Sequence, residues 1–294
     1  MSTISIQNGG VTACIDTLGA QLTSLARGGD EYLWQADPRW WNRHAPVLFP
    51  IVGSIRGDKA SSQQGPVALG RHGLARNYEH AVVSQSPSSV TFELTDSSET
   101  RALYPYAFKL NMTYALSDEG VFTQTFRVEN TGEVDLPFSV GGHPAFNVPA
   151  PGAEGEAFED YELEFAKPWT FESATIVDGG LLTYDVMNPI VKDSDHVALS
   201  RRLFDYDTVM LEDVPGSTVT LRGTKSGRGV RVNFEGFKYL GVWSAAGDAP
   251  FVALEPWTGH ATLTSEDDVF EHKRNITVLA PGKVDERSFS VTLL

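Results

Sequence analysis

Residues 110–128, LNMTYALSDEGVFTQTFRV, decide the fold class of this chain. Apolar and polar side chains alternate on each side of a polar turn, Ser117-Asp118-Glu119-Gly120. Alternate residues of a strand face opposite sides, so this period of two is typical of half-buried strands. The short turn between the two runs predicts an antiparallel β-hairpin.

The same alternation recurs along the chain, whereas helical periodicity is scarce. Only short helical turns are expected, at residues 38–42 and 200–204. Many short strands separated by turn residues indicate an all-β sandwich or barrel. A length of 294 residues favours a large antiparallel two-sheet β-sandwich, with residues 1–294 forming a single domain. Further strands are expected within Ile4–Ile6, Val11–Ile15, Val90–Thr95, Tyr161–Phe165, Val219–Arg222, Val230–Phe234, Val252–Leu254 and Phe289–Leu293.

Composition narrows the classes of function. The formal net charge is −15, so nucleic acids and anionic membranes would be repelled and are not expected as partners. Cys14 is the only cysteine, which leaves no internal disulfide and fits a reducing cytoplasm. The first residues lack the pattern of a signal peptide, and no segment is apolar for long enough to span a bilayer. We expect a cytoplasmic protein that acts on a small molecule as a monomer or homodimer.

His143 is a candidate site residue within Val140-Gly-Gly-His-Pro-Ala-Phe146. The two glycines would let the backbone adopt unusual dihedral angles or approach a ligand closely. Pro144 favours an extended conformation for His143. Histidine has an ordinary pKa of about 6.5, so it can exchange a proton close to neutral pH. The alternative is a structural histidine held by backbone bonds in a turn.

A second candidate stretch is Glu255-Pro256-Trp257. A carboxylate that follows the apolar run Phe251–Leu254 is either an exposed residue at a strand end or a base held in a pocket. Pro256 is expected to end the strand there, because proline has no N–H for the ladder. Trp257 offers an apolar face to a sugar-like ring.

Arginines surround a third stretch, Arg71-His72-Gly73, which is followed by Arg76. Arginine is well suited to binding polar groups, so its concentration in an acidic chain suggests a binding site, although these side chains can equally be solvated. Arg56 has the same two interpretations.

Asp207 and Trp243 complete the candidates. Asp207 either bonds ligand hydroxyls or caps a turn, and Trp243 is either a core residue or a pocket wall. No HExxH or similar metal motif, phosphate-binding loop, dinucleotide fingerprint or GxSxG elbow occurs in the sequence. Neither a metal nor another cofactor is therefore expected.

Taken in order, six segments resemble the aldose 1-epimerase (galactose mutarotase-like) family and, within it, the LacX-like branch. The resemblance implies a β-supersandwich fold and interconversion of the α and β anomers of a free aldose by acid–base ring opening, without a cofactor. The segments are Leu48–Gly53, His72–Arg76, Tyr104–Phe108, Gly142–Asn147, Gly241–Trp243 and Glu255–Gly259.

The resemblance also implies roles for single residues. His143 matches a histidine taken as the general acid, and Glu255 matches a glutamate taken as the general base. His72 matches a substrate-binding histidine that helps to polarise the ring oxygen. Asp207 matches a sugar-binding aspartate, and Arg56 lies roughly where the family has a substrate-binding arginine.

Two alternatives stay open at this point. A hexose-6-phosphate 1-epimerase would need a cationic phosphate pocket, which Arg56, Arg71 or Arg76 would supply. A non-catalytic carbohydrate-binding domain would need no acid and base. In either case Trp257 or Trp243 is expected to stack on the C–H face of the sugar.

Overall fold

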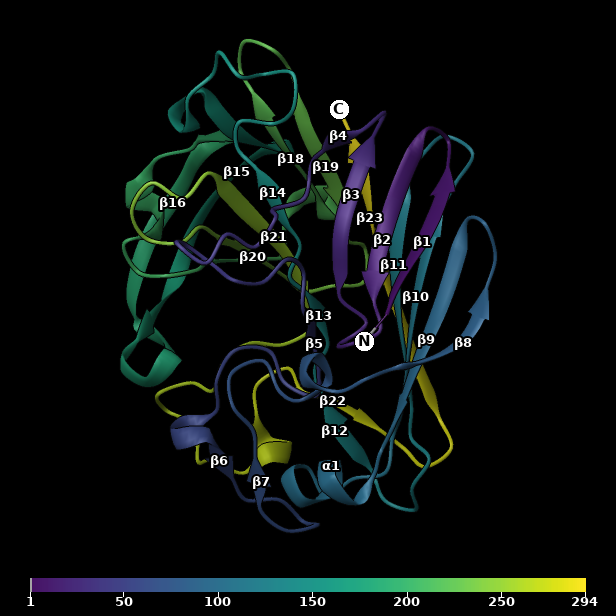
Figure 1. The fold of residues 1–294 in the computed structure, drawn as a ribbon. Coiled ribbons are helices and arrows are strands. Elements are labelled where there is room, and N and C mark those ends of the chain that lie inside the picture. Colours follow the sequence, from purple (N-terminus) through teal and green to yellow (C-terminus); the bar gives the residue numbers. More distant parts are fainter. Residues whose placement is uncertain (1) are drawn as a thin grey trace.

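The computed structural model describes residues 2–294 and consists mainly of strands (Figure 1). The expected hairpin is confirmed at residues 109–129, where Lys109 lies opposite Glu129 and buried residues alternate with partly exposed ones. It forms part of a nine-stranded antiparallel sheet. In spatial order the strands are β16 (Leu181–Ala198), β15 (Tyr161–Val177), β18 (Thr218–Gly223), β19 (Gly229–Asn233), β23 (Val284–Leu293), β11 (Phe122–Glu129), β10 (Lys109–Leu116), β9 (Ser89–Thr95) and β8 (Ala81–Gln85).

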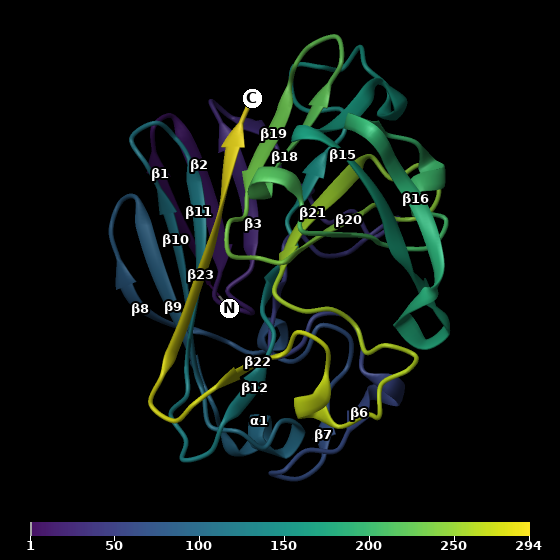
Figure 2. The ribbon, with the colours of Figure 1, turned by 180° about the vertical axis from the view of Figure 1, so that it is seen from behind.

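Two further sheets pack against this one, which confirms the all-β sandwich class. A four-stranded sheet comprises β1 (Thr3–Asn8), β2 (Val11–Asp16), β3 (Leu22–Arg27) and β4 (Asp30–Glu31). A six-stranded sheet comprises β17 (Val209–Glu212), β20 (Tyr239–Trp243), β21 (Phe251–Trp257), β13 (Gly141–Gly142) and β5 (Val47–Leu48), with β14 (Ala145–Asn147) also paired to β21. Strand β1 of the four-stranded sheet contacts β9 and β10 (Figure 2). Strand β17 of the six-stranded sheet contacts β15.

The core between the sheets is rich in aromatic residues. Phe92, Tyr114, Phe122 and Phe126 come from three neighbouring strands and are at most 1% exposed. They occupy the inward positions of the alternating pattern, and each buried aromatic side chain removes a large apolar area from water. The apolar positions of the alternating sequence pattern are therefore the residues that form this core.

Short elements connect the sheets. The only α-helix among residues 2–294, α1 (Ser98–Leu103), was not expected. It is too short to show a helical period and is held by a capping box between Ser97 and Thr100. No helix in the same residues has the length and apolarity to cross a membrane. The remaining elements are β6 (Lys59–Ala60), β7 (Val67–Ala68), β12 (Leu136–Phe138), β22 (Thr277–Leu279) and the 3₁₀ helices Arg56–Asp58, Ala75–Asn77, Phe158–Asp160, Asp178–Gly180, Arg201–Phe204, Pro215–Ser217 and Phe270–His272.

Two sequence expectations need correction. Residues 38–42 form a non-helical turn, whereas the helical turn expected at 200–204 is confirmed at Arg201–Phe204. The strand expected at Tyr161–Phe165 continues to Val177 and pairs with β16 through several register shifts. These shifts interrupt the alternation, so the sequence does not reveal the length of this hairpin.

His80 is a buried histidine that follows the 3₁₀ helix Ala75–Asn77. Its side chain is 3% exposed, and its Nε2 lies 3.1 Å from the carbonyl oxygen of Ala75. Burial lowers the pKa of His80 to about 4.

We expect His80 to make the fold sensitive to acid. The unfolded chain binds a proton near the ordinary pKa of 6.5, whereas the folded chain binds it only near 4, so the free energy of unfolding falls as the pH decreases through this interval. In His80→Gln, which keeps a donor for Ala75, this loss should be smaller by on the order of 2–3 kcal/mol. Urea unfolding at pH 7, 6, 5 and 4 measures it. Equal losses in the variant and the wild type would contradict the expectation, and His196→Gln, at a partly exposed position, is the control.

Candidate functional site

An antiparallel register brings His143 and Glu255 together. Strands β13 and β14 both pair with β21 in one register, in which Gly141 lies opposite Trp257. Carried across the gap between β13 and β14, this register sets His143 opposite Glu255. Directly opposite residues in antiparallel strands point to the same face. The Nε2 atom of His143 lies 3.2 Å from Oε2 of Glu255.

Pro256 lies inside β21 and not at its end, which corrects the sequence expectation. The backbone N–H groups of Leu254 and Thr258 donate to carbonyls on the β13–β14 side. Residue 256 faces the same side because strand residues repeat with a period of two. In this register Pro256 lies opposite Gly142, next to the gap that holds His143, so the missing N–H interrupts the ladder at this point without ending the strand.

The His143–Glu255 pair is shielded from water. The exposed fractions of the two side chains are 8% and 1%. Burial raises the pKa of Glu255 well above its ordinary value, and the nearby charge of Asp207 adds to the rise. Burial also lowers the pKa of His143 to about 3, with a further contribution from nearby arginines. Without a ligand the pair therefore favours its neutral form, with one proton held by Glu255.

Two tryptophans enclose His143. The Trp41 ring stacks on the imidazole at a centroid distance of 4.7 Å, and Trp243 meets it edge-on at 5.7 Å. Trp243 is therefore both a packing residue and a wall of the site. The sequence analysis missed Trp41, because its segment looked like a helical turn and carries no motif.

His72 is oriented by its own backbone and by Gly53. Its N–H donates to the carbonyl oxygen of Gly53 over 2.7 Å, and the Gly53 N–H donates to Nδ1 of His72 over 3.1 Å. Because Nδ1 accepts, the ring proton resides on Nε2. The His72 ring packs against His143 at 5.5 Å, so it can present a donor next to the pair. Its φ of 68° falls in the left-handed region, which histidine tolerates better than most residues.

The glycines of the GGHP segment make room for side chains. A Cβ on Gly141 would lie 2.6 Å from Cδ1 of Trp257, and one on Gly241 would lie 2.5 Å from the far end of the same ring. A Cβ on Gly142 would similarly meet the Phe289 ring at 2.6 Å. Gly141 and Gly142 are absent from the residues with positive φ, so the first of the two alternatives for them, unusual dihedral angles, is wrong. The Trp257 ring instead lies in a slot formed by two glycines.

Asp207 and Arg71 also line the site. Asp207 follows a 3₁₀ turn with a φ of 69°, and its Oδ2 lies 3.5 Å from a guanidinium nitrogen of Arg71. Both residues line a cavity of about 240 Å³ together with the residues above. This volume is near the lower end for ligand pockets and suits a small polar molecule. The lining residues are Trp41, Arg43, Arg71, His72, Arg76, His143, Asp207, Thr208, Trp243, Glu255 and Trp257.

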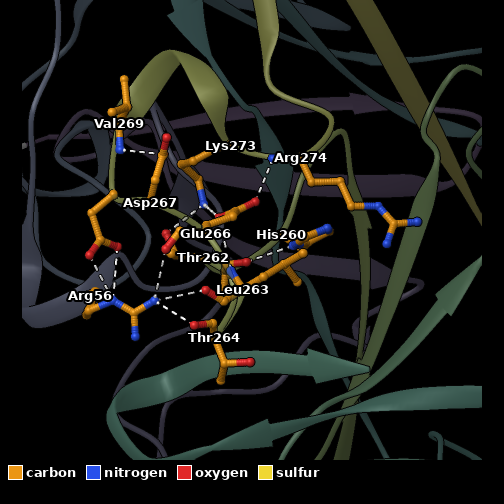
Figure 3. Close-up of polar contacts among 12 residues, drawn as sticks. Arg56, His260, Thr262, Leu263, Thr264, Glu266, Asp267, Val269, Lys273 and Arg274 are labelled. Atoms are coloured by element: carbon orange, nitrogen blue, oxygen red, sulfur yellow. Dashed lines mark hydrogen bonds and ion pairs between the residues drawn. The ribbon is translucent and has the colours of Figure 1, made fainter. Parts of the chain in front are cut away.

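Arg56 is the one proposed site residue that does not line this cavity. Its Nε donates to both carboxylate oxygens of Asp268, and another nitrogen donates to the carbonyls of Leu263 and Thr264 (Figure 3). These contacts bind the 3₁₀ turn at residue 56 to the loop that follows β21. Arg43 and Thr208, which the sequence analysis did not single out, line the cavity. Neither lies in a recognisable sequence motif.

Metal ligands are not assembled at this cavity. Among residues 2–294, no group of three or more histidine, cysteine, aspartate or glutamate side chains is placed to hold a metal ion. The polar groups at hand are a histidine–carboxylic acid pair, a histidine donor, one carboxylate and three guanidinium groups. They can exchange protons and bind the hydroxyl groups of a ligand.

Comparisons with known proteins agree on one family. The family model described as aldose 1-epimerase matches residues 2–276. The plasmid-encoded protein LacX of Lactococcus lactis subsp. lactis is 39% identical over 303 aligned residues, which cover 99% of each chain. Among solved structures, a galactose mutarotase related enzyme from Lactobacillus acidophilus has a TM-score of 0.93 and 33% identity, covering 100% of this chain and 97% of its own. A galactose mutarotase-like protein from Lactobacillus casei ATCC 334 has a TM-score of 0.91 and 31% identity, with 100% of both chains covered.

The glycine slot yields a prediction. Gly241→Ala places a Cβ against the Trp257 ring, which must shift, and overpacking of this kind typically costs about 1–3 kcal/mol of stability. Urea unfolding measures the cost, and tryptophan fluorescence reports the ring. Gly155→Ala is the matched control, because its Cβ would meet no atom within 4 Å and its φ is not positive. Equal stability of the two variants would show that the slot does not constrain Trp257.

Proposed function

This chain belongs to the aldose 1-epimerase family, and we propose that it interconverts the α and β anomers of a free aldose. The family and its mutarotase-like structural relatives support a carbohydrate epimerase. The observation that carries the finer proposal is the buried pair of His143 and Glu255, whose atoms approach to 3.2 Å in a cavity of about 240 Å³.

Mutarotation needs two proton transfers at neighbouring oxygens. One proton leaves the hydroxyl at C1 and another reaches the ring oxygen, so the C1–ring oxygen bond breaks and an aldehyde forms. Rotation about C1–C2 followed by ring closure gives the other anomer. We assign Glu255 as the base at the C1 hydroxyl and His143 as the acid at the ring oxygen. Both oxygens are bonded to C1, so one adjacent acid–base pair can serve them together.

The electrostatics of the site suit this assignment. The proton first moves from Glu255 to His143 across their 3.2 Å contact. Ring opening then starts from this ionised pair, Glu255 carboxylate and His143 imidazolium, and ends with both residues neutral. Burial favours the neutral pair, since it raises the pKa of Glu255 and lowers that of His143. In the proposed mechanism the low-polarity surroundings therefore favour the proton distribution of the ring-open state. The pair holds one proton throughout, and closure on the other face restores its ionised form.

The surrounding residues take positioning roles in the proposal. The Nε2–H of His72 donates to the ring oxygen and assists its protonation. Asp207 accepts hydrogen bonds from sugar hydroxyls. Trp257 and Trp243 offer apolar surface to the C–H face of the ring, as expected for sugar sites with a few polar groups on an apolar wall.

A purely binding domain is the rival class. A binder gains nothing from a carboxylic acid and an imidazole buried against each other, because each loses favourable hydration. The buried pair therefore supports an enzyme. A cytoplasmic location is part of the proposal and rests on the single cysteine, Cys14.

Removal of either proton-transfer group should abolish most of the activity. We expect Glu255→Gln and His143→Asn each to lower kcat by roughly 10²- to 10⁴-fold, because a positioned general acid or base contributes about this much. Polarimetry on freshly dissolved α-glucose and α-galactose, corrected for the uncatalysed rate, measures the change.

Matched controls separate chemistry from folding. His196→Asn and Glu235→Gln make the same chemical changes at positions outside the cavity, and both should keep wild-type rates. Circular dichroism should show that all four variants are folded. Near wild-type rates in folded Glu255→Gln or His143→Asn would overturn the assignment.

The pH dependence should differ from that of an ordinary histidine. The active pair holds one proton, and a second would have to enter at His143, whose pKa is lowered to about 3. With a neutral aldose as substrate, we therefore expect kcat/KM not to fall between pH 7 and pH 5. On the alkaline side activity is lost when Glu255 gives up its proton, which occurs well above 4.5 because burial raises its pKa. An acid limb with a midpoint near 6.5 would contradict this.

A further inference from the structure

Three arginines converge on the cavity of a strongly acidic protein. The chain has 38 acidic and 23 basic residues, yet Arg43, Arg71 and Arg76 all line the site. Of the acidic side chains in residues 2–294, only Asp207 and Glu255 line it with them. Since burial favours the protonated form of Glu255, three positive charges face one negative charge. The cavity thus has the opposite sign to the protein as a whole.

Two of these guanidinium groups have no carboxylate partner. Arg71 reaches Asp207 at 3.5 Å, but within residues 2–294 Arg43 makes no hydrogen bond or ion pair. Arg76 donates only to the carbonyl oxygen of Arg71, and its Nε is buried without a partner. By contrast, Arg39 and Arg101, which lie outside the cavity, each bond to an adjacent carboxylate.

The three like charges also act on one another. Burial lowers the pKa of Arg76 to about 10, and the nearby charges of Arg43 and Arg71 add to the decrease. All three guanidinium groups also disfavour the charged forms of His72 and His143. This mutual repulsion is unfavourable. An anionic ligand would convert it into attraction, because a concave site lined by one sign of charge concentrates ligands of the opposite sign.

We propose that the aldose taken by this site carries a phosphomonoester, which Arg43 and Arg76 bind with the help of Arg71 while C1 faces His143 and Glu255. This rests on the proposed function and names its substrate class. The charge supports phosphate over carboxylate: three arginines and Asp207 leave a net charge of two, and a phosphomonoester has about two negative charges at pH 7. Guanidinium groups also present N–H donors in a fork that matches phosphate oxygens.

The order of Arg71, His72 and Arg76 along the chain suits a sugar that is bound at C1 and at its phosphate simultaneously. His72, next to the proton-transfer pair, lies between Arg71 and Arg76 in one short segment. The Arg76 side chain donates a hydrogen bond to the carbonyl oxygen of Arg71, which links the two ends of this segment. A phosphate bound there would fix the sugar relative to the donor of His72. The phosphate must be on a carbon other than C1, since a C1 phosphate prevents ring opening.

The experiment compares kcat/KM for glucose and galactose, their 6-phosphates, and glucuronate. We expect a preference of at least roughly 10-fold for a 6-phosphate over its neutral sugar, because hydrogen bonds between charged groups are worth this much or more. Arg43→Gln should lower the phosphate-to-neutral ratio by roughly 10- to 100-fold, and Arg43→Lys should retain most of it. Arg127→Gln, a change of charge outside the cavity, should leave the ratio unchanged. Because the Arg43 side chain makes no bonds in the fold, its variants should have a wild-type melting temperature.

The outcomes separate this inference from the proposed function. The phosphate inference is overturned if kcat/KM for the neutral sugars equals or exceeds that for the 6-phosphates and the phosphate-to-neutral ratio does not change in Arg43→Gln. The proposed epimerase activity would still stand in that case. A preference for glucuronate over both phosphates also overturns it. If no sugar is turned over, the proposed function fails, and calorimetry then decides the inference. Binding of glucose 6-phosphate or galactose 6-phosphate that is lost in Arg43→Gln would support it, and no binding of either would overturn it.

Discussion

The antiparallel register between β21 and the pair β13–β14 is the constraint on which the site depends. It places His143 opposite Glu255 on one face of a buried sheet. A slip of one residue would turn Glu255 to the other face, because side chains alternate along a strand. Strand β21 is buried along its whole length and paired on both sides, so the packing that stabilises the sheet also fixes the positions of these two side chains.

Burial then sets the chemistry of this pair. Two ionised groups in an apolar sheet would cost several kcal/mol of solvation each, whereas a carboxylic acid beside a neutral imidazole costs far less. Trp41 and Trp243 reinforce this by covering the imidazole. The same exclusion of water shifts the pKa values of both groups toward the neutral pair. Stability and reactivity therefore depend on the same apolar contacts.

Charge is distributed against the overall composition. The net charge of −15 repels polyanions at long range, but the cavity concentrates arginine side chains, two of which have no acidic partner. A small anion at close range experiences the local field more strongly than the screened charge of the whole surface. The net charge of a protein therefore predicts its binding of large polyanions better than its binding of small ligands.

The sequence by itself determined the all-β class, because the alternation at residues 110–128 is compatible with strands and not with helices. The ordered motifs also identified His143, Glu255 and His72 as candidate site residues, because single residue types can be recognised in a sequence without knowledge of their contacts. Tertiary structure alone decided what these residues meet. The 3.2 Å approach of His143 to Glu255 comes from strand pairing between distant segments, and local patterns do not encode pairing. For the same reason no sequence pattern separated Arg56, which is bound to Asp268, from Arg43, which faces the cavity.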